Sequence, residues 1–175
     1  VFDQNSFTAA NQFVTLNVNA TVNNMIWSGA QFNPGFGTPY HGNYQLTLNI
    51  NGDLVINDQM RWTWAKGYYY INNGIYDILN LKGSFKLNPN VTWGHDNLTY
   101  FNTSAGSHEV DLAGKSFVEN VYFTGLSGSE LVLENNFIVN PSFSTYFTSG
   151  KILSNGYNVD FGRSLFANNS NAKHL

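Results

Sequence analysis

Acidic side chains are the residues of this sequence that could catalyse proton transfer or hold calcium, provided that several of them meet on one face. The chain of 175 residues contains eleven, none adjacent to another in sequence: Asp3, Asp53, Asp58, Asp77, Asp96, Glu109, Asp111, Glu119, Glu130, Glu134 and Asp160. Arg61 and Arg163 are its only arginines. This spacing assembles no carboxylate pair, so the sequence predicts no catalytic residue and no enzyme.

The other side chains capable of chemistry give no stronger signal. His41, His95, His108 and His174 lack the short spacing of paired metal ligands. His95-Asp96 and His108-Glu109 could meet if the chain coils, and calcium is the ion that Asp and Asn oxygens would suit best. Gly125 to Ser129 misses the Gly-x-Ser-x-Gly nucleophile motif by one position. We therefore predict no metal and no cofactor.

Aromatic residues crowd between Met60 and Tyr76, and they are the best candidates for recognition. Planar rings stack on sugars at little cost in conformational entropy. In an alternating strand Trp62 and Trp64 share one face, as do Tyr68 and Tyr70, with Tyr69 opposite. The candidate glycan platform consists of Trp62, Trp64, Tyr68, Tyr69 and Tyr70. The favoured alternative is that many of these rings pack in the core.

Composition excludes several classes of partner. Only 11% of residues are charged, 16% are aromatic, 27 are asparagine, and the net charge is -3. Nucleic-acid binding needs clustered basic residues, and the eight Lys and Arg form no such cluster. No apolar run approaches the roughly 20 residues of a membrane helix, and residues 1–10 do not resemble a signal peptide. Without cysteine, disulfides and thiolate metal sites are also excluded.

Apolar residues alternate with polar ones along the chain, which is typical of half-buried strands. One frame of alternating residues occurs three times, starting at Leu48, Leu79 and Leu131. Weaker copies start at Leu16, Val110 and Leu153, and the interval between copies is longer in the first half of the chain than in the second. Such repetition indicates a solenoid, in which Leu48, Leu79 and Leu131 would occupy equivalent stacked positions.

The fifth position of the frame is Gly or Asn, which suits a corner that needs positive φ. Gly52, Gly83, Gly114, Asn135 and Asn155 are the predicted corners. An array of hairpins with short turns is the local alternative. The flanking strands are very short, too short for stable hairpins, and this favours pairing between coils. Stacked coils predict ladders of identical residues about 4.8 Å apart, where amides are tolerated and like charges repel.

Several segments resemble repeated β-solenoid modules of very large secreted surface proteins of Bacteroidota. The resemblance covers most of the chain and is carried by 1–7, 14–18, 23–29, 114–117, 121–123 and 150–157. It implies a right-handed coil, export by the type IX system, and a structural or adhesin-like role at the cell surface. The aromatic segment 61–76 departs from the pattern of these modules, and no carboxy-terminal sorting domain is present.

These observations together predict an all-β, right-handed parallel β-helix of about six irregular coils, with residues 1–175 as one segment of a longer chain and an aromatic-rich insertion around 60–76. We expect a non-catalytic, extracellular structural or adhesive segment of a cell-surface or filament protein. Its partners would be further domains of the same chain, and surface glycans or neighbouring chains. A carbohydrate-binding or carbohydrate-degrading β-helix is the alternative, and it requires an exposed aromatic strip or an acid cluster.

Overall fold

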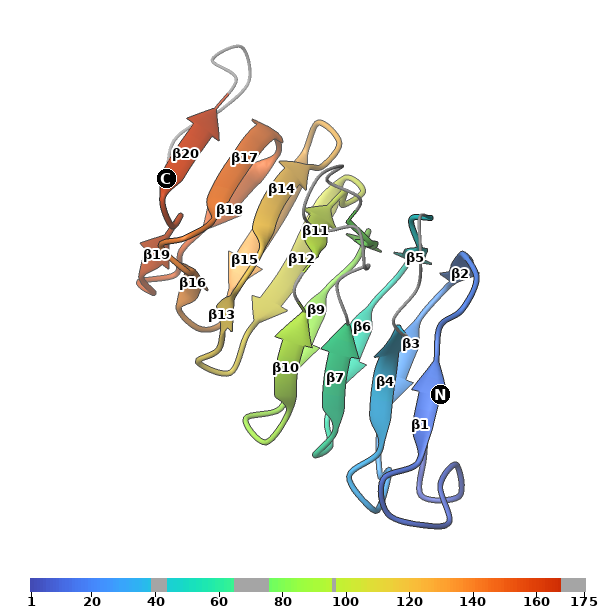
Figure 1. Ribbon diagram of the computed structural model, residues 1–175. Coiled ribbons are helices and arrows are strands. Elements are labelled where there is room, and N and C mark those ends of the chain that lie inside the picture. The colour runs from blue at the N-terminus through green and yellow to red at the C-terminus, as the bar shows by residue number, and fades with distance from the viewer. Residues whose placement is uncertain (39–43, 65–75, 96, 168–175) are drawn as a thin grey trace.

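The computed structural model describes residues 1–38, 44–64, 76–95 and 97–167. Within these ranges the chain forms short β-strands that pair in parallel. Successive strands step from one sheet to the next and return after three strands, so the chain winds into a parallel β-helix of about six coils (Figure 1). The predicted all-β solenoid is therefore confirmed. None of the described segments is a helix that could span a membrane.

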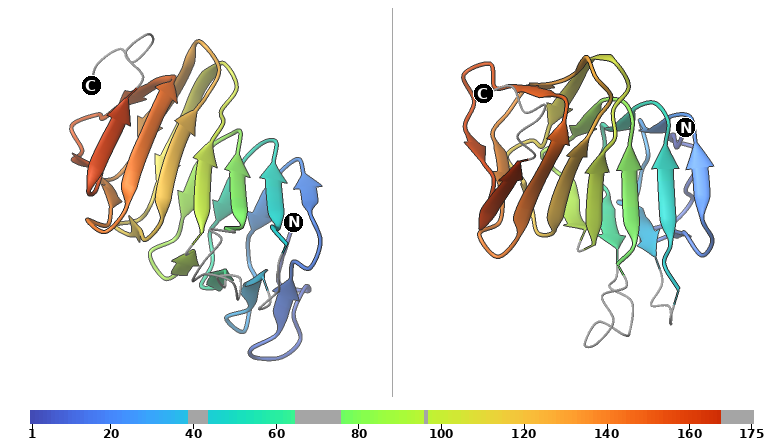
Figure 2. Two further views of the ribbon diagram at one scale, coloured as in Figure 1. Left: turned by 45° about the horizontal axis from the view of Figure 1, so that its top comes forward. Right: turned by 90° about the horizontal axis from the view of Figure 1, so that it is seen from above.

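Two sheets run along most of the stack. The seven-stranded sheet contains β2 (Ala20–Val22), β5 (Thr47–Ile50), β8 (Ile78–Leu81), β11 (Leu98–Phe101), β14 (Asn120–Thr124), β17 (Ser144–Ser149) and β20 (Ser164–Ala167). The six-stranded sheet contains β3 (Met25–Trp27), β6 (Leu54–Ile56), β9 (Phe85–Leu87), β12 (Gly106–Asp111), β15 (Ser129–Leu133) and β18 (Lys151–Leu153). The first and last coils lie at opposite ends of the stack (Figure 2).

The third side of the coil is divided between two smaller sheets. The four-stranded sheet contains β1 (Phe13–Thr15), β4 (Gly35–Thr38), β7 (Arg61–Trp64) and β10 (Thr92–His95). The three-stranded sheet contains β13 (Ser116–Phe117), β16 (Phe137–Val139) and β19 (Val159–Asp160). The change from one sheet to the other divides the stack into an amino-terminal and a carboxy-terminal part.

Alternation within each strand sends every second side chain into the interior. On the seven-stranded sheet Ile50, Leu81, Phe101 and Phe123 form one inward column, and each is at most 2% exposed. The rings of Phe101 and Phe123 stack at 5.3 Å between centroids. The core is therefore a set of ladders, in which the same position of successive coils packs against itself.

The repeated frame is correct for two of its three main copies. Leu48 pairs with Leu79 in the seven-stranded sheet, and Ile56 pairs with Leu87 in the six-stranded sheet. Leu131 instead lies in β15 and pairs with Ile152, so its predicted equivalence to Leu48 and Leu79 is wrong. The frame at Leu48 and Leu79 crosses the corner between the seven-stranded and six-stranded sheets, whereas the frame at Leu131 crosses the corner between the six-stranded and three-stranded sheets. Each corner separates two short strands with inward apolar residues, so the sequence pattern does not distinguish the two corners.

The coil lengths differ from the predicted intervals for a related reason. One inward position of the seven-stranded sheet is occupied in turn by Ala20, Leu48, Leu79, Thr99, Val121, Thr145 and Leu165, so the coils that follow Leu79 are shorter than those before it. The coil that contains β11 was missed, because its inward position holds Thr99 where the frame expects an aliphatic residue. Thr99 is fully buried, and its hydroxyl donates to Glu119 Oε1 at 2.9 Å.

The corner residues have two different physical roles. Gly114 and Asn155 have positive φ, at +78° and +49°, as predicted. Gly52, Gly83 and Asn135 do not have positive φ, so the predicted reason is wrong for these three. A Cβ at Gly83 would lie 2.5 Å from the carbonyl carbon of Gly52. The two glycines are required because neighbouring coils approach each other too closely for a side chain.

Candidate binding surface

A single column of side chains runs along the outer face of the seven-stranded sheet. We call it the outer column; the strand register places in it Thr21, Asn49, Asn80, Tyr100, Tyr122, Tyr146 and Phe166. From β5 to β17 these residues alternate with buried neighbours and are themselves only half-buried. The column therefore faces away from the core in every coil that it crosses.

The amino-terminal half of the outer column is a ladder of polar side chains. Asn80 Nδ2 donates to Asn49 Oδ1 at 3.1 Å, and Asn49 Nδ2 donates to Thr21 Oγ1 at 3.3 Å. An amide both donates and accepts, so identical residues can bond to one another along the stack. An amide ladder therefore exists, but Thr21, Asn49 and Asn80 all lie within strands and not at the bends where outward asparagines were expected to stack.

The carboxy-terminal half of the outer column is a ladder of rings. Tyr100 and Tyr122 stack at 4.5 Å with an interplanar angle of 10°, and Tyr122 and Tyr146 stack at 4.6 Å and 7°. Phe166 continues the ladder at 4.9 Å from Tyr146, and 53% of its surface is exposed. Neighbouring rings cover each other's faces, so the tyrosines present ring edges and hydroxyl groups to the outside.

Two phenols of the ladder, those of Tyr100 and Tyr122, remain uncharged over a wide pH range. Burial raises the pKa of Tyr100 above its ordinary value. At Tyr122 burial is the largest cause, and the nearby phenols of Tyr100 and Tyr146 add to it, raising the pKa to about 12. A phenolate between two other phenols would be poorly solvated and would repel further ionisation. Tyr100 and Tyr122 therefore stay neutral at physiological pH.

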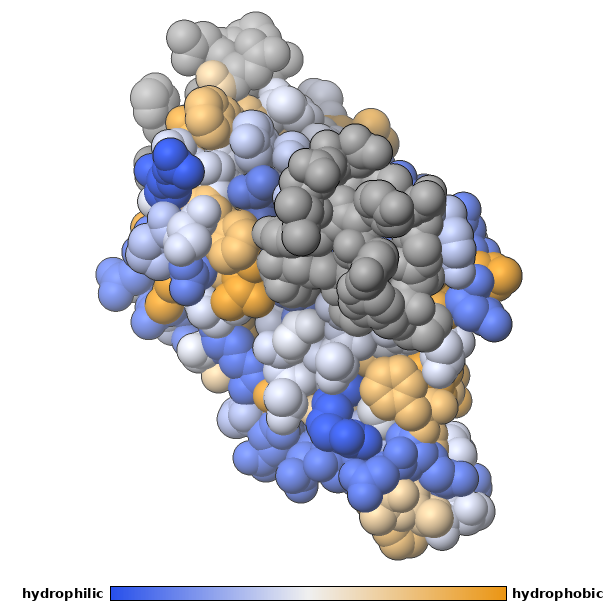
Figure 3. All heavy atoms as spheres, viewed as in Figure 1, coloured by the Kyte–Doolittle hydropathy of each residue, from blue (hydrophilic) through white to orange (hydrophobic). Residues whose placement is uncertain are grey.

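Ionisable residues are distributed very unevenly between the two long sheets. None of the residues in the seven strands from β2 to β20 of the seven-stranded sheet is Asp, Glu, Lys, Arg or His. The six-stranded sheet carries Lys86, Glu109, Asp111, Glu130 and Lys151, besides His108. Space-filling colouring of one side of the molecule shows hydrophobic residues as separate small patches among hydrophilic ones (Figure 3).

Four charged side chains on the six-stranded sheet form two pairs of opposite sign. Lys86 Nζ contacts Glu109 Oε2, and this bond is the largest cause that raises the pKa of Lys86. Lys151 Nζ lies 3.1 Å from Glu130 Oε1 and lowers the pKa of that carboxyl. Their side chains are 34% to 50% exposed, so each pair contributes little to stability.

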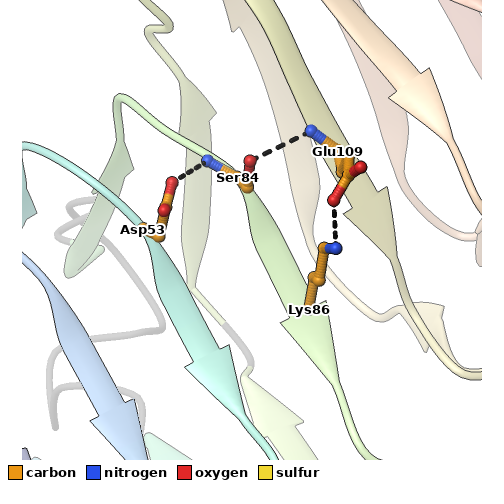
Figure 4. Close-up of polar contacts among 4 residues, drawn as sticks. All are labelled: Asp53, Ser84, Lys86 and Glu109. Atoms are coloured by element: carbon orange, nitrogen blue, oxygen red, sulfur yellow. Dashed lines mark hydrogen bonds and ion pairs between the residues drawn. The ribbon is translucent and has the colours of Figure 1, made fainter.

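Polar side chains near the corner beside this sheet hold neighbouring coils together (Figure 4). Asp53 Oδ1 accepts a hydrogen bond from the Ser84 backbone N–H at 2.8 Å, and Ser84 Oγ accepts one from the Glu109 backbone N–H at 3.1 Å. In the preceding coil, Asn24 Oδ1 accepts from the Asp53 backbone N–H at 2.8 Å. Each of these side chains accepts a hydrogen bond from a backbone N–H of the next coil. A hydroxyl can accept this bond as a carboxylate does, which explains why Asp53 is followed in the next coil by Ser84 and not by another acid.

Two further carboxylates are buried inside the stack. Asp77 accepts hydrogen bonds from Trp64 Nε1 at 2.8 Å and from the Leu46 backbone N–H at 2.7 Å. Glu119 accepts from Thr99 Oγ1 and from the Val118 backbone N–H. Among the residues that the structure describes, no three of His, Cys, Asp and Glu gather in a way that could hold a metal ion.

The predicted glycan platform is divided by the structure. Trp62 and Trp64 lie on β7 and are 0% and 1% exposed, so these two candidates are wrong as surface residues. Their shared face points inward, where Trp62 stacks on Trp93 at 5.1 Å and packs against Phe36 at 4.7 Å. Arg61 to Trp64 therefore belong to a regular coil and not to an insertion. Tyr68, Tyr69 and Tyr70 lie outside the described residues.

The histidines do not assemble a site in the described residues. His95 is fully buried beside Trp62, whose Nε1 lies 3.5 Å from His95 Nδ1, and burial lowers the pKa of His95 to about 3. His108 lies in a different sheet, where its Nε2 lies 3.1 Å from the Ser104 carbonyl oxygen. His41, His174 and Asp96 lie outside the described residues.

Sequence reasoning missed Tyr100, Tyr122, Tyr146 and Phe166 as a group. Each of these rings pairs with the next in register, so they recur at the coil period of this part of the stack. An aromatic residue recurring at that period, next to an inward residue, was the available signal. The signal is hidden because the coil that contains Tyr100 carries Thr99, and not an aliphatic residue, at its inward position.

Comparison with known proteins adds no functional assignment. No protein-family model, no curated protein and no solved structure was found to match the chain significantly. Function is therefore inferred from the geometry of the described residues and from the resemblance carried by the sequence.

Proposed function

We propose that this chain is a non-catalytic structural segment of a large extracellular protein, at a cell surface or in a filament, and that its faces contact other molecules. The observation that carries the proposal is the use of its polar side chains. Asp53, Ser84 and Asn24 bond to the backbone of the adjacent coil, and Asp77 bonds to buried groups. Side chains of a type that catalyses reactions elsewhere are here engaged in holding coils together.

Repetition supports a scaffold role. Each coil of a solenoid contacts only its neighbours, so length can be added without designing a new core. The stacked positions tolerate amides, rings and opposite charges, and all three occur in this chain. The resemblance to Bacteroidota surface modules supports export by the type IX system and an adhesin-like role.

Labelling of intact cells tests the proposed location. Cells that produce the parent protein would be treated with a membrane-impermeant amine reagent, and modification of Lys86 and Lys151 would be measured by mass spectrometry. Both side chains are partly exposed, so we expect labelling without lysis. Labelling only after lysis would contradict an extracellular location.

An assay of polysaccharide cleavage tests the absence of catalysis. The protein would be incubated with neutral and acidic polysaccharides, and new reducing ends would be counted. We expect none above background. Turnover that Glu109→Gln or Asp53→Asn abolishes, while folding is retained, would contradict the proposal and favour a carbohydrate-degrading β-helix.

A further inference from the structure

We propose that the outer column of the seven-stranded sheet binds a neutral, linear polysaccharide along the axis of the solenoid. This inference rests on the proposed extracellular contact role and specifies its partner. No single ring or pocket defines the site. It is defined by the series of half-exposed side chains from Thr21 to Phe166.

The shape of the column suits a narrow polymer. Its members lie on adjacent strands in register, and adjacent strands are about 4.8 Å apart, so the track is about 29 Å long. It is one side chain wide. The length of a strand adds a width of about 13 Å, so the whole face offers roughly 400 Å², about half of what each partner contributes to a standard protein interface. A second folded protein would find too little area here, whereas an extended chain needs only the track.

The chemistry of the column suits hydroxyl groups. Thr21, Asn49 and the three tyrosines end in groups that can donate and accept hydrogen bonds, and a polysaccharide presents hydroxyl groups that do the same. Asn80 Oδ1 is buried, and Asn80 Nδ2 donates to Asn49, so Asn80 supports the column beneath the ligand. Stacking covers the faces of the internal rings, so the phenol hydroxyls are the groups that reach a ligand. Recognition would therefore come from a row of weak polar contacts.

The absence of charge selects the class of polysaccharide. None of the seven strands contains an ionisable side chain other than tyrosine, so this face offers no counter-charge to a polyuronate or sulfated polymer. A neutral chain loses nothing by that absence. Because binding involves no ion pair, it should also be insensitive to salt.

Sedimentation with insoluble polysaccharides tests this inference. The full 175-residue chain would be mixed with cellulose, chitin or mannan as neutral probes, and with calcium-crosslinked polygalacturonate gel as the anionic probe. We expect retention on at least one neutral probe, unchanged in 1 M NaCl, and no specific retention on polygalacturonate. If the protein binds none of the three neutral probes, the inference is overturned. The proposal of an extracellular structural segment would not be affected, because the labelling of intact cells tests it separately.

Variants of the ladder locate the binding. The triple variant Tyr100→Phe, Tyr122→Phe and Tyr146→Phe keeps the stacked rings and removes three hydroxyls, and it should lower the affinity at least tenfold. The matched control, Lys86→Ala with Glu109→Ala, alters the six-stranded sheet and should leave binding unchanged. Equal retention of the wild type and the triple variant would overturn the inference. So would dimerisation of the wild type, in analytical ultracentrifugation, that the triple variant abolishes, because the column would then bind a second copy.

Discussion

The outer faces of the two long sheets bring side chains of successive coils into contact, but they do so with different chemistry. On the seven-stranded sheet Tyr122 touches Tyr100 and Tyr146, so identical rings lie next to one another. On the six-stranded sheet Lys86 lies next to Glu109, and Glu130 next to Lys151, so opposite charges are paired between coils. Stacking at about 4.8 Å permits identical neighbours only if they are uncharged, since like charges at that distance repel.

This difference explains the composition of the chain. Charged side chains occur where the strand register places a residue of opposite charge in the adjacent coil, as for Glu130 and Lys151. Elsewhere amides and rings take the outward positions, which accounts for the many asparagines and aromatic residues among only 11% charged ones. The two faces therefore differ in their response to pH, salt and truncation, and these responses can be measured.

The largest expected effect concerns the neutral imidazole of His95, which is buried inside the stack. Burial lowers its pKa to about 3, against 6.5 in an unfolded chain, so the folded protein keeps the imidazole neutral. As pH falls below 6.5 the unfolded state takes up a proton that the folded state does not, and stability decreases. We expect a loss of about 2 kcal/mol between pH 7 and pH 5, measured by urea unfolding.

His95→Gln is the control for this pH dependence. Glutamine can accept the hydrogen of Trp62 Nε1 and does not titrate, so the variant should lose most of the decrease between pH 7 and pH 5. An unchanged decrease in the variant would show that other groups, and not His95, cause it.

The second prediction compares truncation on the two faces. Tyr122→Ala removes two stacked contacts and the partly buried ring, and it should lower the free energy of unfolding by about 2 kcal/mol. Glu109→Ala removes one exposed ion pair and should lower it by less than about 1 kcal/mol. Urea unfolding of both variants measures the difference. A larger effect of Glu109→Ala would reverse the comparison.

The general architecture could be predicted from the sequence, but the register could not be predicted throughout. Leu48 and Leu79 were aligned correctly because both coils keep a large apolar residue at the inward positions on either side of the glycine. The alignment failed at Thr99, where a buried hydroxyl bonded to Glu119 replaces the expected aliphatic residue. A local sequence pattern assigns a polar residue to the surface, because it cannot show that the residue is hydrogen-bonded to a partner distant in sequence.

The candidate site was predicted less well than the fold. Alternation correctly placed Trp62 and Trp64 on one face, but it does not indicate whether a face of aromatic rings points to the core or to a ligand. The direction is set by packing against Phe36 and Trp93 from neighbouring coils. The ring ladder depends in the same way on coil register, because Tyr100 and Tyr122 meet only through the pairing of β11 with β14.

Alkaline titration should distinguish the ladder from free tyrosine. The pKa of Tyr122 is raised to about 12, chiefly by burial, so it should ionise about two pH units above an exposed phenol. Since the unfolded chain ionises first, stability should decrease as pH rises above 10. Ultraviolet difference spectra of the wild type and Tyr122→Phe measure this, and identical titration curves near pH 12 would contradict it.

The smallest expected effect is the coupling between Lys86 and Glu109, and its salt dependence separates the two faces most directly. A double-mutant cycle with Lys86→Ala and Glu109→Ala should give at most about 1 kcal/mol, because both side chains are substantially exposed. In 0.5 M NaCl the coupling should largely disappear, since the screening length is then only about 4 Å. The corresponding cycle between Tyr122 and Tyr146 should not change with salt, because stacked neutral rings carry no net charge to screen. If salt changed the two coupling energies equally, the proposed difference between neutral ring stacking on one sheet and ion pairing on the other would be contradicted.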